Sequence, residues 1–145
     1  MFRYSPRSLK QIDTLHIDLQ VLLLDVIKNT PVDICITEGY RTKERQYELY
    51  KEGKSQIDGI NKKGMHNYKP ARAFDFCAFV NGKATWDTKY LDFLAGIILG
   101  TSIRLAREGK IEKPVVWGLD WNSDGNFDDT KFKDRPHIQL HSSVS

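Results

Sequence analysis

The sequence contains only two cysteines, Cys35 and Cys77, among 145 residues. This count excludes the disulfide-dense scaffold that is typical of small secreted domains. Each cysteine lies in an apolar, β-like run, where a small thiol packs well, so the favoured interpretation is two reduced core cysteines. One disulfide bridge stays open as an alternative, because the two runs could form neighbouring strands.

Long apolar runs are absent as well. The first apolar run, residues 21–24, is interrupted by Asp25, and the polar start of the chain does not resemble a secretory signal. No stretch is long and apolar enough to span a membrane, so we expect no membrane partner. Internal repeats and linkers rich in Pro, Gly or Ser are also missing. We therefore expect one domain over residues 1–145, without a separate binding module.

Charge of one sign does not dominate, since the formal net charge is only +3. A mildly basic surface favours encounter with an anionic polymer, but the basic residues are too dispersed to predict a nucleic-acid partner.

Periodic apolar positions predict an α+β fold with about three helices packed on a small, mainly antiparallel sheet. The predicted helices cover residues 8–29, 42–52 and 87–107, and the predicted strands cover residues 32–37, 72–79, 115–117 and 137–140. The dipeptide Asn81-Gly82 after the central strand is a strong hairpin signal.

Three residues at separated positions, His66, Asp75 and His137, have the side chains of a metal site. Three protein ligands leave the fourth position of a zinc ion open, which distinguishes a catalytic zinc site from a structural one. Asp75 stands between Phe74 and Phe76 in an apolar strand, where a free carboxylate is costly to bury without a cation or a strong donor. Spacing alone does not exclude structural histidines, because His and Asp are common residues.

Asp134, three residues before His137, could reach the same centre. A carboxylate beside a metal site can accept a proton from water and pass it to a leaving amine. Alternatively, Asp134 braces the turn at Pro136.

An acidic loop follows the predicted strand 115–117 and predicts a second, calcium-type site. Oxygen-bearing side chains alternate along it, with a glycine where calcium loops turn sharply. Lys131, however, occupies the twelfth position, where such loops carry Glu. The candidate calcium ligands are Asp120, Asn122, Asp124 and Asp128.

Four ordered motifs between residues 32 and 141 resemble those of a known enzyme family. They are Gly39-Tyr40-Arg41-Thr42 with Gln46, His66-Asn67 with Ala71 to Phe76, Trp117-Gly118 with Asp120 to Gly125, and Phe132 to His137. This set resembles the zinc peptidases of the D-alanyl-D-alanine carboxypeptidase/VanY type, the M15 family. It is most similar to the phage endolysin branch, which cleaves L-alanyl-D-glutamate bonds in peptidoglycan.

The resemblance implies a role for each matched residue. It makes His66, Asp75 and His137 the zinc ligands, Asp134 the general base and acid, and Arg41 the group that binds the substrate carbonyl and stabilises the oxyanion. Without the family, an ion pair of Arg41 with Glu38 or Glu44 is the simpler interpretation.

One departure from the family pattern lies next to the first ligand. Gly64 stands where family members usually carry Ser, so a supporting hydrogen bond there is either missing or supplied by Asn67.

The resemblance also implies a D-Ala-D-Ala carboxypeptidase/hedgehog-like fold and a monomeric, zinc-dependent endolysin that acts on peptidoglycan stem peptides. Because the start of the chain does not resemble a secretory signal, we expect accumulation in the host cytoplasm before lysis. The alternatives are a D,D-carboxypeptidase acting on D-Ala-D-Ala termini, or a non-catalytic wall-binding module that keeps the fold.

Overall fold

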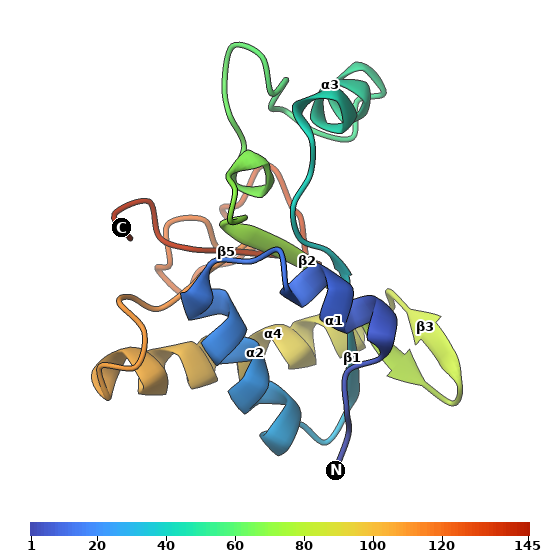
Figure 1. Ribbon diagram of the computed structural model, residues 1–145, viewed down its shortest axis with the longest axis vertical. Helices are drawn as coiled ribbons and strands as arrows, with labels where there is room; N and C mark the ends of the chain where they lie inside the picture. Colours follow the sequence, from blue (N-terminus) through green and yellow to red (C-terminus); the bar gives the residue numbers. More distant parts are fainter.

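A computed structural model describes all residues from 1 to 145 (Figure 1). The helices are α1 (Pro6–Ile12), α2 (Ile17–Asn29), α3 (Lys43–Lys51), the short 3-10 helix η1 (Met65–Asn67) and α4 (Thr88–Arg107). The strands are β1 (Asp33–Glu38), β2 (Ala73–Val80), β3 (Lys83–Thr85), β4 (Val116–Trp117) and β5 (His137–Gln139).

The five strands form one antiparallel sheet in the order β1-β2-β5-β4, and β3 pairs with β2 as a hairpin. The hairpin turns at the predicted Asn81-Gly82, whose φ angles of 52° and 76° are both positive, as a two-residue turn of this kind requires. The predicted α+β class with a small antiparallel sheet is therefore confirmed.

Helices α1, α2 and α4 gather at one end of the molecule, and α3 stands apart at the other (Figure 1). Helix α2 packs against α4, α4 packs against β2, and α1 packs against β1. Fully buried side chains such as Leu22, Phe74 and Ile98 join these elements in one core. No helix has the length and apolar character needed to cross a membrane.

The predicted single helix over residues 8–29 is wrong, because the chain forms two helices there. Residues 13–16 leave the helical path: the N–H of His16 donates to the carbonyl of Ala71, and Leu15 forms a bridge with the same residue. Leu15 enters the core at 2% exposure, and the His16 side chain caps α2. Long-range pairing with the segment before β2 thus outweighs the continuous helical periodicity.

Cys35 and Cys77 lie directly opposite each other on β1 and β2. Both thiols are free, as the favoured interpretation predicted.

Candidate metal centre

Strand register places two of the predicted metal ligands side by side. Asp75 on β2 pairs directly with His137 on β5. On its other side, an irregularity in β1 after Ile36 shifts the pairing so that Glu38 faces Asp75. The third ligand, His66, comes from η1, which contacts β2. The site is therefore built across three strands and one helical turn.

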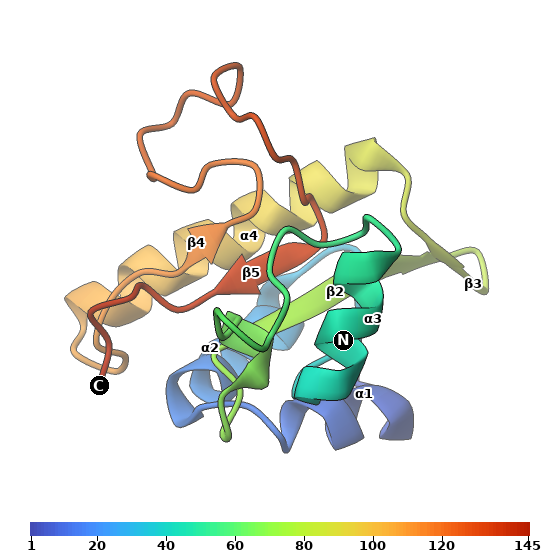
Figure 2. The ribbon, with the colours of Figure 1, turned by 90° about the horizontal axis from the view of Figure 1, so that it is seen from above.

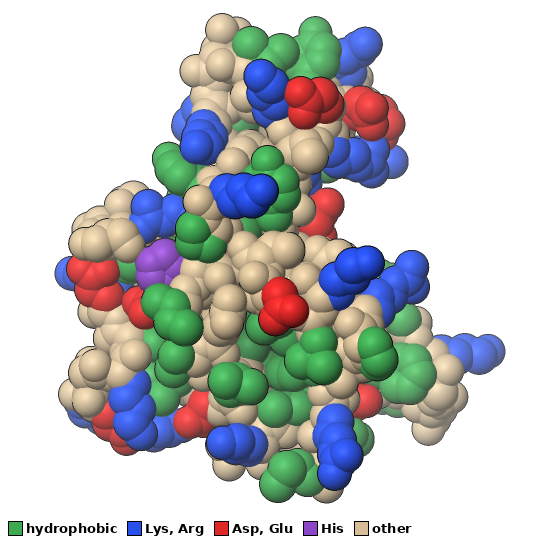
Figure 3. Space-filling view, viewed as in Figure 1, with side chains coloured by type: hydrophobic (Ala, Val, Ile, Leu, Met, Phe, Trp, Pro, Cys, Tyr) green, Lys and Arg blue, Asp and Glu red, His purple; other side chains and the backbone are tan.

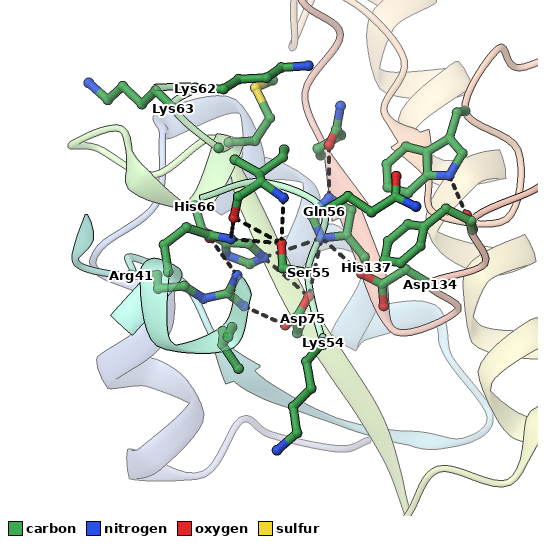
Figure 4. Close-up of a pocket in the computed structure, with 18 of the residues that line it drawn as sticks. Arg41, Lys54, Ser55, Gln56, Lys62, Lys63, His66, Asp75, Asp134 and His137 are labelled. Atoms are coloured by element: carbon green, nitrogen blue, oxygen red, sulfur yellow. Dashed lines mark hydrogen bonds and ion pairs between the residues drawn. The ribbon is translucent and has the colours of Figure 1, made fainter. Parts of the chain in front are cut away.

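The ligand atoms of the three residues form a nearly equilateral triangle (Figure 4). His66 Nε2 lies 3.3 Å from His137 Nδ1 and 3.3 Å from Asp75 Oδ1, and His137 Nδ1 lies 3.4 Å from Asp75 Oδ1. Zinc bonds of about 2.0–2.1 Å in a tetrahedron place ligand atoms about 3.3–3.4 Å apart. The triangle therefore has the dimensions of one face of a zinc tetrahedron, and these residues can hold a metal ion.

The outer nitrogen of each imidazole has a partner that orients the ring. His66 Nδ1 lies 2.8 Å from the carbonyl of Gly39, and because a carbonyl only accepts, this nitrogen carries the proton. His137 Nε2 lies 2.9 Å from Oε1 of Gln139. These bonds leave His66 Nε2 and His137 Nδ1 as the lone-pair atoms that face the centre.

The electrostatics of the cluster favour a positive charge at its middle. Asp75 Oδ1 is buried and accepts no hydrogen bond. Burial alone raises the pKa of Asp75, but the neighbouring His66 and His137 together bring it below its ordinary range. Burial lowers the pKa of His137, yet Asp75 and Asp134 raise it overall. An unpaired buried carboxylate oxygen between two imidazoles is a fitting place for a cation.

Arg41 contacts the second oxygen of the central carboxylate (Figure 4). Its Nη2 lies 3.5 Å from Asp75 Oδ2, while Nε donates to Glu38 at 2.8 Å and Nη1 donates to Gln46 at 2.9 Å. The ion pair with Glu38 that the residues alone suggested is present, whereas Glu44 makes none with Arg41. Arg41 thus holds Asp75 in place and also lines the cleft described next.

Asp134 faces the same centre without being one of the three ligands. Its Oδ2 lies 3.9 Å from His137 Nδ1, and its side chain makes no hydrogen bond that would brace the turn at Pro136. Burial, together with the charge of Asp75, raises the pKa of Asp134 above its ordinary value. A carboxyl group with a raised pKa beside an open metal position suits general acid–base chemistry.

A cleft of about 740 Å³ opens above the triangle. One wall is the loop of residues 54–63 that follows α3, and the other is the long loop between β4 and β5, which contributes Trp121 and Phe132. Figure 2 shows the 54–63 loop passing in front of β2 and β5, and the long β4–β5 loop extending beyond β4. Apart from Asp75 and Asp134, every charged side chain that lines the cleft is basic.

Several residues that shape the site had no predicted role. Gln139 could have been found from strand alternation, because it follows His137 by two residues and shares its face. Of the two alternatives at Gly64, the structure shows no hydrogen bond from Asn67 to His66: Asn67 accepts from the N–H of Gly64 and donates to the carbonyl of Arg41. The carbonyl of Gly39 supports His66, and no side-chain pattern reveals a backbone acceptor.

The acidic loop does not assemble a comparable cluster. The carboxylate of Asp120 accepts the N–H groups of Asp124 and Gly125, and Asp124 in turn accepts the N–H of Asn126. The carboxylates of this loop accept hydrogen bonds from the backbone of its own turns. They do not form a metal-binding group like the His66–Asp75–His137 triangle.

Two histidines and a carboxylate that could hold a metal ion, at the floor of a cleft and beside the carboxyl group of Asp134, have the composition of a hydrolytic metalloenzyme site. The chain belongs to the phage L-alanyl-D-glutamate peptidase family, whose model matches residues 1–141. It is thus a peptidase, as the resemblance predicted.

Individual relatives agree with this membership. The L-alanyl-D-glutamate peptidase of Escherichia phage T5 is 27% identical over 96% of this chain and 98% of its own length. The peptidoglycan L-alanyl-D-glutamate endopeptidase CwlK of Bacillus subtilis is 31% identical, and the match covers 77% of this chain and 63% of CwlK. The crystal structure of the Serratia marcescens L-Ala D-Glu endopeptidase ChiX has a TM-score of 0.72 and 28% identity, covering 97% of this chain and 90% of ChiX.

Proposed function

We propose that this protein is a zinc-dependent endolysin that cleaves the bond between L-Ala and D-Glu in peptidoglycan stem peptides. The observation that carries the proposal is the triangle of His66 Nε2, Asp75 Oδ1 and His137 Nδ1, whose sides of 3.3–3.4 Å fit a tetrahedral zinc ion. Family membership supports the choice of bond, since the T5, CwlK and ChiX relatives are all named for it.

The residues around the triangle have complementary roles in this proposal. Bound zinc would supply an activated water and polarise the scissile carbonyl. Asp134 accepts the proton of the attacking water and passes it to the leaving amine of D-Glu. Arg41 stabilises the negative charge that develops on the carbonyl oxygen, and the same guanidinium restrains Asp75.

The charge of the cleft supports an acidic peptide as substrate. A glutamate linked through one carboxyl group keeps the other one free, so the stem peptide brings a carboxylate next to the scissile bond. Lys54, Lys62 and Lys63 line the wall of the cleft that faces Trp121, and Figure 3 shows basic side chains spread over the end of the molecule near α3. Acidic side chains are interspersed among them at that end, so it is the three lysines of the cleft wall that attract a negatively charged substrate.

Digestion of purified peptidoglycan tests the proposal, with the new termini identified by mass spectrometry. We expect new L-Ala carboxyl ends together with D-Glu amino ends, from the zinc-loaded protein but not after chelation. Release of free D-Ala would instead identify a D,D-carboxypeptidase. A zinc-loaded protein that binds peptidoglycan and creates no new ends would be a wall-binding module.

We further propose that the protein acts as a monomer, accumulates in the host cytoplasm and reaches the wall at lysis. The acidic loop is a candidate second cation site on its sequence pattern alone, because Asp120, Asn122, Asp124 and Asp128 are oxygen-bearing residues at alternating positions. Calorimetric titration of the metal-free protein with calcium tests this site. An absence of both heat and a thermal shift would remove calcium from the proposal.

A further inference from the structure

Helix α3 buries a single residue, and that residue is polar. Gln46 is 2% exposed, whereas the remainder of α3 is exposed or half-buried. A surface helix ordinarily buries an apolar stripe against the core, and α3 has no such stripe. What this helix contributes to the interior is therefore an amide group, whose hydrogen bonds define its role.

The amide of Gln46 joins two parts of the site in a fixed orientation. Its Oε1 accepts from Arg41 Nη1 at 2.9 Å, and its Nε2 donates to Ser55 Oγ at 2.8 Å and to the carbonyl of Ile57 at 2.7 Å. A guanidinium only donates and a carbonyl only accepts, so the amide cannot be rotated by 180° without losing both contacts. An amide fits this position because its oxygen accepts from the guanidinium and its nitrogen donates to the carbonyl.

Each end of this link reaches the cleft. On one side, Arg41 Nη2 contacts Asp75 Oδ2 at 3.5 Å, behind the oxygen that belongs to the triangle. On the other side, Ser55 and Ile57 belong to the loop of residues 54–63, which forms one wall of the cleft. Figure 4 shows Ser55, Arg41 and Asp75 among the residues that line the cleft.

We propose that Gln46 is a positioning residue that couples the 54–63 wall to the metal centre. Its oxygen keeps Arg41 directed at Asp75, and its nitrogen holds the wall at Ser55 and Ile57. Gln46 lines the cleft but acts through these neighbours, not on the substrate. The inference rests on the proposed function for its kinetic part, whereas its effects on zinc binding and on the wall can be measured without substrate.

Two substitutions separate the two ends of the link. Gln46→Glu retains an oxygen for Arg41 but places a second acceptor against the carbonyl of Ile57, so the bond to that carbonyl is lost, while the hydroxyl of Ser55 can still donate to the new carboxylate. Gln46→Met has a similar length and supports neither bond. Ser55→Ala removes one partner of the nitrogen and leaves Gln46 itself intact. The matched controls are Gln20→Glu and Gln20→Met, because Gln20 also donates to a backbone carbonyl, that of Leu15, at 2.9 Å, but lies on α2.

The experiment measures zinc affinity by chelator competition, hydrogen exchange of residues 54–63, and kcat and KM separately. For Gln46→Glu and Ser55→Ala we expect faster exchange in the wall and a severalfold higher KM, with zinc affinity within about twofold of wild type. For Gln46→Met we expect the same faster exchange in the wall. We also expect a roughly tenfold loss of zinc affinity and a lower kcat, because Arg41 is no longer held against Asp75. The Gln20 variants should match wild type.

The inference is overturned if the exchange of residues 54–63 is unchanged in Gln46→Glu and Ser55→Ala. It is also overturned if Gln46→Glu and Gln46→Met bind zinc equally, since a purely structural glutamine would not distinguish them. Should Gln46→Met fail to fold, Gln46→Glu and Ser55→Ala still decide the part that concerns the wall. Failure of the wild-type protein to create L-Ala and D-Glu ends would refute the proposed function and leave the zinc and exchange results valid.

Discussion

The imidazole of His66 donates from Nδ1 to the carbonyl of Gly39 at 2.8 Å, and this bond selects the tautomer that turns Nε2 toward Asp75. Gly39 is itself held in place, because its N–H donates to the side chain of Gln11 at 2.9 Å. The first predicted ligand is therefore oriented by a backbone group that helix α1 positions. Support of this kind is expected to influence metal affinity as strongly as many direct contacts do.

Gly39→Ala should weaken zinc binding without altering any ligand. A Cβ at this position would lie 2.3 Å from Thr14 Oγ1 and 2.7 Å from the carbonyl oxygen of Gln11. The backbone must shift to relieve these contacts, which moves the acceptor of His66. We expect zinc affinity to fall by about 10- to 100-fold, as measured by chelator competition.

Gly96→Ala is the matched control for that substitution. Nothing lies within 4 Å of a Cβ at Gly96, which is exposed in the interior of α4. Alanine should stabilise this helix by about 0.5–1 kcal/mol, observed as a higher midpoint of urea unfolding, with zinc affinity unchanged. Equal zinc affinity in the two alanine variants would show that the Gly39 carbonyl does not support the site.

Asp134→Ala should abolish peptidoglycan cleavage while zinc stays bound. Asp134 lies 3.9 Å from His137 Nδ1 and outside the triangle, so its loss removes the proton carrier and not a ligand. We expect kcat to fall by about 10²–10⁴-fold, with one zinc per chain by elemental analysis. His66→Ala and His137→Ala should lose both zinc and lysis. Full activity of Asp134→Ala would refute the assigned mechanism.

Two of the three candidate ligands have a local signature in the sequence, whereas His66 is assigned through the family resemblance. Asp75 interrupts an apolar strand, and His137 begins a short strand directly after a turn. These patterns depend on neighbours in the chain, as does the Asn81-Gly82 hairpin.

The groups that hold the ligands in place could not be predicted from the sequence, because they depend on strand register and on backbone pairing between residues far apart in the chain. Glu38 faces Asp75 only because the pairing of β1 shifts after Ile36. Likewise, the break between α1 and α2 depends on the pairing of Leu15 with Ala71, 56 positions further along the sequence. Propensity and periodicity carry no information about such long-range pairs.

The two thiols should be nearly inert in the folded protein. Burial raises the pKa of Cys77 to about 12 from an ordinary 9.0, and burial also raises the pKa of Cys35. At pH 8 little thiolate forms, so we expect slow labelling by a thiol reagent in the native state and rapid labelling in urea. A disulfide would contradict this, and intact mass with and without reductant detects one.

Stability should also fall at alkaline pH. The Cys77 thiol ionises in the unfolded chain at its ordinary value but in the folded chain only near pH 12. Its protonated form therefore favours folding below pH 9, and this contribution is lost as the pH rises from about 9 to about 12. Urea unfolding of wild type and Cys77→Ala across pH 8–10.5 measures it, and the wild-type stability should decline more steeply. Parallel pH dependence in the two proteins would show that Cys77 makes no such contribution.

Lys62→Met should raise KM through the loss of a contact to the free carboxylate of the substrate. Of the three lysines that line the cleft, Lys54 pairs with Glu52 at 3.1 Å and Lys63 lies over the ring of Tyr68, whereas Lys62 has no ion pair. It is thus the cation that remains available for the substrate.

Exposed ion pairs contribute about 0.2–1 kcal/mol, so we expect KM to increase roughly 1.5- to 5-fold in low salt and less in high salt. Kinetics on two synthetic stem peptides give the sharpest measurement, one with a free glutamate carboxyl group and one with that group converted to an amide. Wild type should favour the carboxylate peptide, and Lys62→Met should lose the preference. Lys28→Met, which removes an exposed lysine on α2, should behave as wild type. An unchanged preference in Lys62→Met would assign carboxylate recognition to another group in the cleft.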